Sequence, residues 1–158
     1  MTVKLAEDDM VLQICFLTPD LERSAEWFSG LTGKQIPSIN QTPEGGAPAT
    51  YQGERIRTGF RQLLFEFGNI AIEFIQPGTE PGTWRDFLDE QGPGVHHIAF
   101  KTGNIERDTA FLANKGHATI QLGEFEGGGG RYGYYDTMKE LGCLIELLEF
   151  DSDRERRS

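Results

Sequence analysis

The chain contains two copies of one short pattern, and this internal repeat restricts its fold more than any other feature. Residues 13–23 (QICFLTPDLER) align with residues 97–107 (HIAFKTGNIER) at a constant offset of 84. Five of the eleven positions are identical, and two more carry conservative replacements. We therefore expect two related structural modules in one chain.

Each copy predicts a strand followed by a helix. Asp20 and Asn104 are good N-cap residues, and an acidic residue follows each of them in the first helical turn, where it suits the helix dipole. Gly33 and Gly116 are expected to end the two helices. Between cap and stop, three equivalent positions form a stripe at helical spacing. These are Leu21, Ala25 and Phe28 in the first copy, and Ile105, Thr109 and Leu112 in the second.

Hairpins complete both modules. Residues 60–67 and 70–77 flank a Gly-Asn turn signal, and residues 131–137 and 143–150 flank MKELG. Short strands are expected earlier in each module, near 34–39 and 117–121. Each module then has the order strand, helix and three strands (βαβββ).

The modules are expected to span about 10–77 and 94–150, within a single domain of residues 1–158. Residues 78–93 would connect them and contain a short helix near Thr83–Asp89. The tail, 151–158, lacks apolar residues with which to pack, and is expected to be frayed.

Alternation along the strands separates the two histidines of GVHHIAFKT. Neighbouring side chains of a strand point to opposite faces. We therefore expect His96 to lie beneath a helix with Ile98 and Phe100. His97 should face the other way, together with its repeat equivalent Gln13.

The last strand of each module carries one carboxylate among apolar residues. Glu73 lies in AIEFI and Glu146 in LIELL, and the two correspond if the second module is 11 residues shorter. Pseudo-twofold symmetry would bring both to Gln13 and His97. A carboxylate in such a strand is unfavourable unless it is paired, protonated or metal-bound. One nitrogen and three oxygen donors suit one divalent ion such as Zn, Ni, Co, Mn or Fe, with water in the open positions.

Composition argues against several functions. The net charge of -10 disfavours a nucleic-acid partner. No apolar run approaches the roughly 20 residues that span a bilayer, and the N-terminus MTVKLAEDDMV lacks the features of a signal peptide. A cytoplasmic protein without membrane contact is expected. Cys15 and Cys143 show no CxxC spacing and are interpreted as buried thiols.

The paired modules, with GVHHIAF and LIELLEF, resemble the vicinal oxygen chelate superfamily, which includes glyoxalase I, methylmalonyl-CoA epimerase, fosfomycin-resistance enzymes and extradiol dioxygenases. The resemblance covers roughly residues 10–150. It implies an α+β fold in which two βαβββ modules form a curved mixed sheet around a central metal pocket. It also implies a homodimer. The family's metal ligands lie on the first and last strand of each module, which here carry Gln13, Glu73, His97 and Glu146.

The ligand order Gln, Glu, His, Glu is similar to that of zinc-type glyoxalase I, whereas HHIAF, IELLEF and GNIAIEFIQP are closer to methylmalonyl-CoA epimerase. Both imply proton transfer next to a metal-bound carbonyl of a small oxygenated metabolite, by an epimerase, an isomerase or a glyoxalase-type lyase. Glu146 is the expected catalytic base and Glu73 the second choice. The epimerase resemblance also implies a carboxylate near the start of the third strand. There the chain reads RTGFR, with Glu66 further along.

Two other functions stay open. An Fe(II) extradiol dioxygenase would use two histidines and one carboxylate, but Gln13 stands where its first histidine should be. A non-catalytic antibiotic-binding protein of the bleomycin-resistance type normally has no metal set. Arg57, Arg61 and Arg131 are candidates for holding an anionic substrate. The glycine run 127–130 is interpreted as a loop that borders the pocket.

Overall fold

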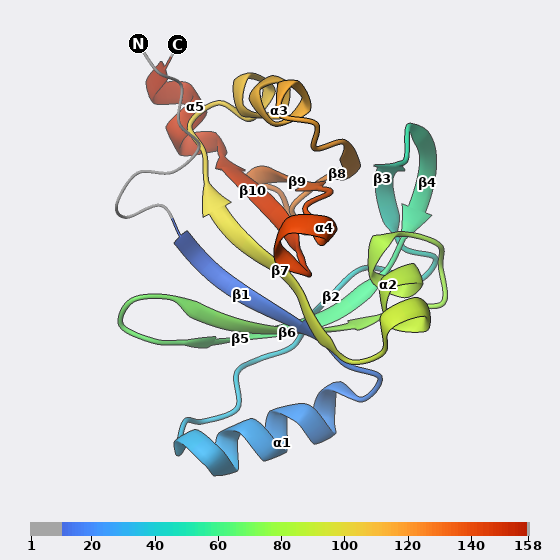
Figure 1. The fold of residues 1–158 in the computed structure, drawn as a ribbon. Helices are drawn as coiled ribbons and strands as arrows, with labels where there is room; N and C mark the ends of the chain where they lie inside the picture. Colours follow the sequence, from blue (N-terminus) through green and yellow to red (C-terminus); the bar gives the residue numbers. More distant parts are fainter. Residues whose placement is uncertain (1–10, 158) are drawn as a thin grey trace.

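The computed structural model describes residues 11–157, which form one ten-stranded mixed sheet with five helices (Figure 1). The strands are β1 (Val11–Leu17), β2 (Asn40–Gln41), β3 (Ala47–Tyr51), β4 (Glu54–Thr58), β5 (Phe60–Glu66), β6 (Ala71–Pro77), β7 (Gly94–Lys101), β8 (Thr119–Glu124), β9 (Gly130–Tyr135) and β10 (Leu144–Phe150). The helices are α1 (Leu21–Thr32), α2 (Thr83–Gln91), α3 (Ile105–Asn114), α4 (Met138–Leu141) and α5 (Asp151–Arg157). Most of the N-terminal segment judged from sequence, residues 1–10, lies outside this range.

The sheet has an approximate twofold relation at its centre. Its order is β2-β5-β6-β1-β7-β10-β9-β8-β3-β4. Strand β1 runs parallel to β6, β7 runs parallel to β10, and β1 and β7 pair antiparallel in the middle. The order from β2 to β1 therefore mirrors that from β8 to β7. This confirms the predicted α+β architecture of two βαβββ modules in one curved sheet.

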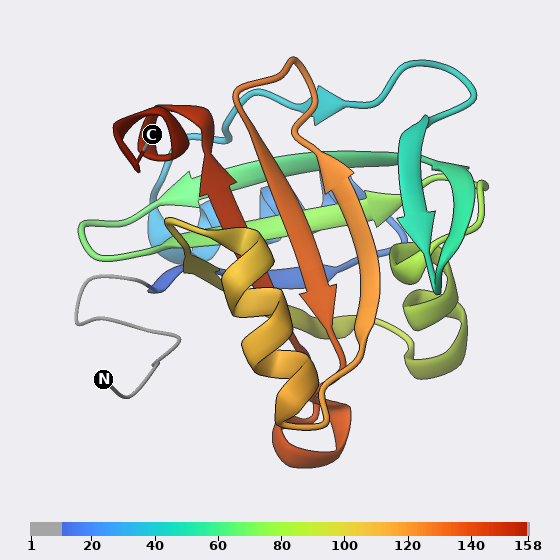
Figure 2. The same ribbon diagram turned by 90° about the horizontal axis from the view of Figure 1, so that it is seen from above.

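The two module helices cover the outside of the curled sheet (Figure 2). The predicted caps are confirmed, because the side chains of Asp20 and Asn104 each accept a backbone N–H three residues on, at 3.0 Å. Gly33 ends α1 in the left-handed region, at φ 73°. Helix α1 packs on the β5–β6 hairpin through Leu21 and Ala25. Helix α3 packs on β9 and β10 in the equivalent way.

The strand predicted near 34–39 is wrong in position. Residues 33–39 are irregular, and the edge strand β2 is only Asn40–Gln41. Pro37 explains part of this difference, because it has no N–H to donate to a neighbouring strand. The predicted strand near 117–121 is present as β8.

The region between β2 and β5 contains a hairpin that the sequence did not predict. Strands β3 and β4 join through Gln52 and Gly53, which both have positive φ, 50° and 83°. The hairpin crosses to the other module, where Ala49 of β3 pairs with Gly123 of β8. The first module therefore extends the edge of the second.

The tail expected to be frayed is instead helix α5. Asp151 and Asp153 stand in its first turn, where negative charge suits the helix N-terminus. Lys101 Nζ lies 3.1 Å from Asp153 Oδ2 and ties α5 to β7. Charged side chains thus supply the contacts that apolar residues could not. Within residues 11–157, no helix is long and apolar enough to cross a membrane.

Candidate active site

The four predicted ligand residues come together on the four central strands of the sheet. Gln13 lies on β1, Glu73 on β6, His97 on β7 and Glu146 on β10. Nε2 of His97 is 2.9 Å from Oε2 of Glu146 and 3.4 Å from Oε1 of Glu73. With its amide oriented to suit its neighbours, Gln13 donates to Oε1 of Glu73 at 3.1 Å. The repeat equivalence thus places all four side chains in one cluster.

The cluster contains buried polar atoms that lack hydrogen bonds. His97 is fully buried and Glu146 is 5% exposed. Their facing atoms, Nε2 and Oε2, lie 2.9 Å apart and form an ion pair when His97 is protonated, but they do not meet in hydrogen-bond geometry. Buried polar atoms without partners are unfavourable. An imidazole nitrogen and carboxylate oxygens directed at one point therefore fit a divalent cation.

The charges within the cluster are strongly coupled. Burial alone would lower the pKa of His97, but the Glu146 carboxylate and the Cys15 side chain together outweigh it and hold this pKa well above its ordinary value. Burial raises the pKa of Glu146, and His97 offsets part of that effect. In the ion-free protein, a protonated His97 between two carboxylates thus compensates part of their charge.

Cys15 also belongs to this cluster, although the sequence interpretation described it only as a buried thiol. It is fully buried and stands opposite Glu73 on one side and His97 on the other. Ligand atoms of these three residues lie within 4.8 Å of one another. Burial raises the pKa of the thiol, so it is uncharged. Its place two residues after Gln13, on the same strand face, is the signal that could have identified it.

His96 does not lie beneath a module helix with Ile98 and Phe100, as alternation predicted. The pairing of β1 with β7 shifts from Cys15 opposite His97 to Phe16 opposite Val95, so His96 is the extra residue of a β-bulge. Nδ1 of His96 lies 2.8 Å from Nδ1 of His97. The bulge therefore brings the two rings into contact.

The other ring nitrogen of His96 anchors it to helix α2. Its Nε2 lies 3.1 Å from Oγ1 of Thr83, and its ring packs edge-on against Phe87. Burial, together with the charge of His97, holds the pKa of His96 well below its ordinary value. The neutral His96 ring can orient His97 through their shared contact.

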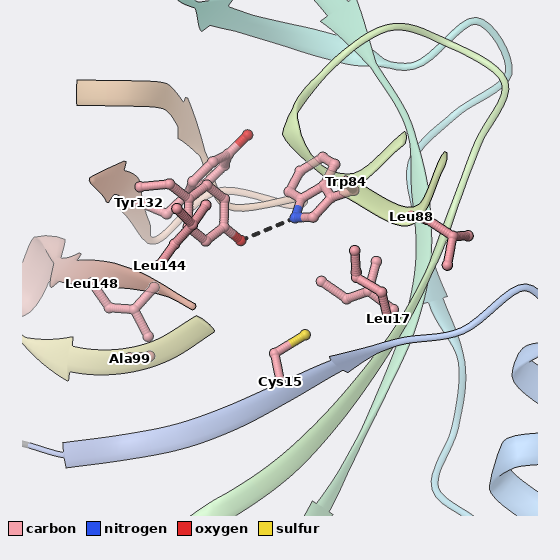
Figure 3. Packing of buried hydrophobic residues seen from close by; sticks show 10 residues of the cluster. Cys15, Leu17, Trp84, Leu88, Ala99, Tyr132, Leu144 and Leu148 are labelled. Atoms are coloured by element: carbon pink, nitrogen blue, oxygen red, sulfur yellow. Dashed lines mark hydrogen bonds between the residues drawn. The ribbon is translucent and has the colours of Figure 1, made fainter. Parts of the chain in front are cut away.

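A pocket of about 350 Å³ opens above the cluster, and Gln13, Glu73 and Glu146 contribute to its lining. Trp84 of α2 donates through Nε1 to the Tyr134 hydroxyl at 3.2 Å, which fixes two of its walls (Figure 3). Six aromatic side chains line the pocket: Phe60, Trp84, Phe125, Tyr132, Tyr134 and Phe150. A larger hollow, about 670 Å³, lies along β3, β4 and β8 and contains none of the four residues. Polar groups converging in a largely apolar pocket mark the smaller one as the candidate site.

The loop after β8 borders the pocket as predicted. Glu124, Phe125, Glu126 and Gly128 are among the lining residues. Positive φ values of 84°, 86° and 96° at residues 127–129 explain the run of glycines, since other residues rarely adopt this conformation.

The three arginines considered for anion binding all lie outside the pocket lining. Arg61 pairs with Glu22, and Arg131 pairs with Glu149. Arg57 donates to the backbone carbonyls of residues 45 and 46. The additional carboxylate expected on the third strand is also missing from the pocket, because Glu66 is exposed and lines a separate hollow beside residues 34–38.

Comparison with known proteins places these features in context. A family model described as Glyoxalase/Bleomycin resistance protein/Dioxygenase superfamily matches residues 12–135. The uncharacterized protein YqjC of Bacillus subtilis (strain 168) is 26% identical over 106 residues, which are 66% of this chain and 73% of that protein. Human mitochondrial methylmalonyl-CoA epimerase is 22% identical over 137 residues, 86% of this chain and 70% of that protein.

A solved structure, methylmalonyl-CoA epimerase in complex with methylmalonyl-CoA and NH4+, has a similar fold. Its TM-score is 0.63 at 21% identity, and the match covers 90% of this chain and 94% of that chain. At this identity the likeness establishes the shared fold.

Proposed function

The chain belongs to the glyoxalase/bleomycin resistance protein/dioxygenase superfamily, and from this premise we propose that it is a divalent-metal-dependent enzyme of the epimerase type. It would transfer a proton at the carbon next to a carbonyl group. The observation that carries this proposal is the convergence of Gln13, Glu73, His97 and Glu146, with buried atoms that lack hydrogen bonds, at an apolar pocket. The similarity to methylmalonyl-CoA epimerases supports the reaction type.

The four residues would hold the ion through His97 Nε2, the Gln13 amide oxygen and the two carboxylates. When bound, a divalent ion polarises a carbonyl oxygen and stabilises the negative charge that develops on it. The identity of the ion among Zn, Ni, Co, Mn and Fe is left to experiment. His96 would keep the His97 ring in place through the contact between their Nδ1 atoms.

Glu146 is the residue proposed to remove the proton, with its carboxylate moving on and off the ion site. Its carboxylate lines the pocket, and its Oε2 makes no hydrogen bond. Burial raises its pKa, which makes it a stronger proton acceptor than an exposed carboxylate. Glu73 comes from the equivalent strand of the other module and is proposed as the second proton carrier. Two proton carriers on different sides of one carbon would allow the configuration of that carbon to be inverted. A single carrier would only exchange its proton with solvent.

The walls have a separate role. Trp84 and Tyr134 are almost completely buried and joined by a hydrogen bond. Burial raises the pKa of Tyr134 well above its ordinary value, so its hydroxyl stays protonated beside Glu146. These side chains would exclude bulk water from the reacting carbon.

The test is solvent deuterium incorporation, followed by NMR, into a panel of ketones, thioesters and 2-oxo compounds. Metal-replete protein is expected to catalyse exchange at the carbon beside one class of carbonyl, and removal of the ion with a chelator should abolish it. If a carbonyl compound binds in the pocket and no exchange occurs in the metal-replete protein, the proposed function is contradicted and a binding protein is favoured.

A further inference from the structure

The pocket has no basic side chain among the described residues that line it. Its ionisable carboxyl groups are Glu73 and Glu146 at the ion site, Glu124 at the end of β8 and Glu126 in the loop that follows. On the basis of the proposed function, we infer that the substrate is an uncharged, largely apolar carbonyl compound, and that compounds with a free carboxylate are excluded. This substrate class differs from methylmalonyl-CoA, the compound held by the structurally similar epimerase.

The charge of the site supports this substrate class. A divalent ion would offset the charges of Glu73 and Glu146, which leaves the inner part of the pocket close to neutral. Glu124 and Glu126 are exposed, so their charges are partly screened, but they still repel an approaching anion at low salt. An anion would thus lose hydration in an aromatic pocket and gain no cationic partner.

Three arginines stand next in sequence to pocket residues, and each already has a carboxylate partner: Arg61 has Glu22, Arg85 has Asp89 and Arg131 has Glu149. Arg131 pairs with Glu149, which is 1% exposed and also accepts the N–H of Ile105 at the start of α3. Moving Arg131 into the pocket would deprive a buried carboxylate of its charge partner.

Arg61 occupies the equivalent place in the other module. It pairs with Glu22 and also contacts Gln76, whose side chain accepts the N–H of Leu21 at the start of α1. The repeat thus assigns both arginines to the starts of the module helices rather than to a ligand.

The aromatic lining and the volume of the pocket indicate which ligands it can bind. Its six aromatic side chains and its volume of about 350 Å³ are suited to a compact apolar molecule, at the lower end of the usual range for ligand pockets. Asn40 and Gln62 also line the pocket, and their amides can form hydrogen bonds with neutral oxygen atoms of a substrate.

A matched pair of probes tests the inference: methyl 4-acetylbenzoate and 4-acetylbenzoate share an acetyl group and differ in charge. Binding can be followed by the fluorescence of Trp84 in a Trp27→Phe background, because these are the two tryptophans of the chain and Trp27 is 65% exposed on α1. We expect the ester to bind about tenfold more tightly than the carboxylate at low salt. Equal or tighter binding of the carboxylate, or no binding of the ester, would overturn the inference.

Charge variants identify the source of the discrimination. Replacing Glu124 and Glu126 with glutamine is expected to reduce the ratio of ester affinity to carboxylate affinity about threefold at low salt. High salt should reduce this affinity ratio in the parent protein as well. Replacing Glu90 and Glu140 makes the same change in net charge at exposed positions outside the pocket lining, and should leave the ratio unchanged. A ratio that responds equally to both double variants would contradict the role of Glu124 and Glu126.

Deuterium exchange at the acetyl group of the same probes separates this inference from the proposed function. Ester binding without exchange would contradict the proposed function and support the substrate class. Exchange into the carboxylate with a kcat/KM equal to that of the ester would support the function and overturn the substrate class.

Discussion

Nε2 of His97 and Oε2 of Glu146 face each other at 2.9 Å, both buried, without a hydrogen bond between them. This arrangement predicts that His97→Ala weakens binding of a divalent ion by about 100-fold, because it removes the imidazole donor of the cluster. Isothermal titration calorimetry with Zn, Ni, Co and Mn measures the loss. His117→Ala is the matched control, since His117 lies outside the cluster and contacts the Asp136 carbonyl instead. Similar weakening in both variants would contradict the assignment.

Ion binding is expected to depend on pH. Because the pKa of His97 is well above its ordinary value in the ion-free protein, the ion must displace a proton from it. Affinity should therefore fall as the pH is lowered. Calorimetry in buffers of different ionisation enthalpy should show proton release on binding. Ion binding that does not change with pH would contradict this coupling.

The raised pKa of His97 also predicts how the stability of the ion-free protein depends on pH. A raised folded-state pKa means that protonated His97 stabilises the fold fully below its unfolded pKa, near 6.5, and that this contribution is lost as the pH rises through the folded-state value. Chelator-treated protein should therefore lose stability with rising pH over that window, and His97→Ala should flatten the profile. Denaturant unfolding at several pH values measures it. A His97 variant with the profile of the parent protein would contradict the assignment.

Repeat equivalence makes a prediction about the two helix-anchoring arginines. Arg131→Met should lower the free energy of unfolding by about 2 kcal/mol, because it removes the guanidinium partner of the buried Glu149. Arg61→Met should cost less than about 1 kcal/mol, since its partner Glu22 is exposed and Gln76 is neutral. Urea unfolding gives both values. If the two variants lost the same free energy of unfolding, burial of Glu149 would not explain the difference between the two arginines.

Thr83 offers a test of how His97 is held. Removing its hydroxyl with Thr83→Val takes away the polar contact of His96 Nε2 and is expected to weaken ion binding about tenfold. Thr83→Ser, which keeps the hydroxyl, should restore most of the affinity. Calorimetry together with thermal unfolding separates this effect from loss of the fold, and failure of the serine variant to recover affinity would contradict it.

The sequence predicted the modules well because the signals involved are local and occur twice. The N-caps, the glycine stops and the alternating strands all depend on near neighbours, and the offset of 84 related one copy to the other. The convergence of Gln13 with Glu73, and of His97 with Glu146, followed from equivalent positions on strands. The repeated local patterns therefore predicted contacts between residues that are far apart in the sequence.

The remaining features depend on contacts that no local pattern encodes. The His96 bulge arises from the register between β1 and β7, and alternation alone placed that ring on the wrong face. The β3–β4 hairpin is stabilised by pairing with β8 of the other module. The interpretation of Arg131 required knowledge of Glu149, which is buried by tertiary packing.

The central claim is that Glu146 moves the proton, and the rate of solvent deuterium incorporation into a substrate by metal-replete protein tests it most directly. Glu146→Gln should reduce the rate by at least about 1,000-fold while the fold is kept, since the amide cannot accept the proton. Glu140→Gln, at an exposed position outside the pocket lining, should exchange at the parental rate. Parental exchange by Glu146→Gln, with the ion bound, would contradict the account.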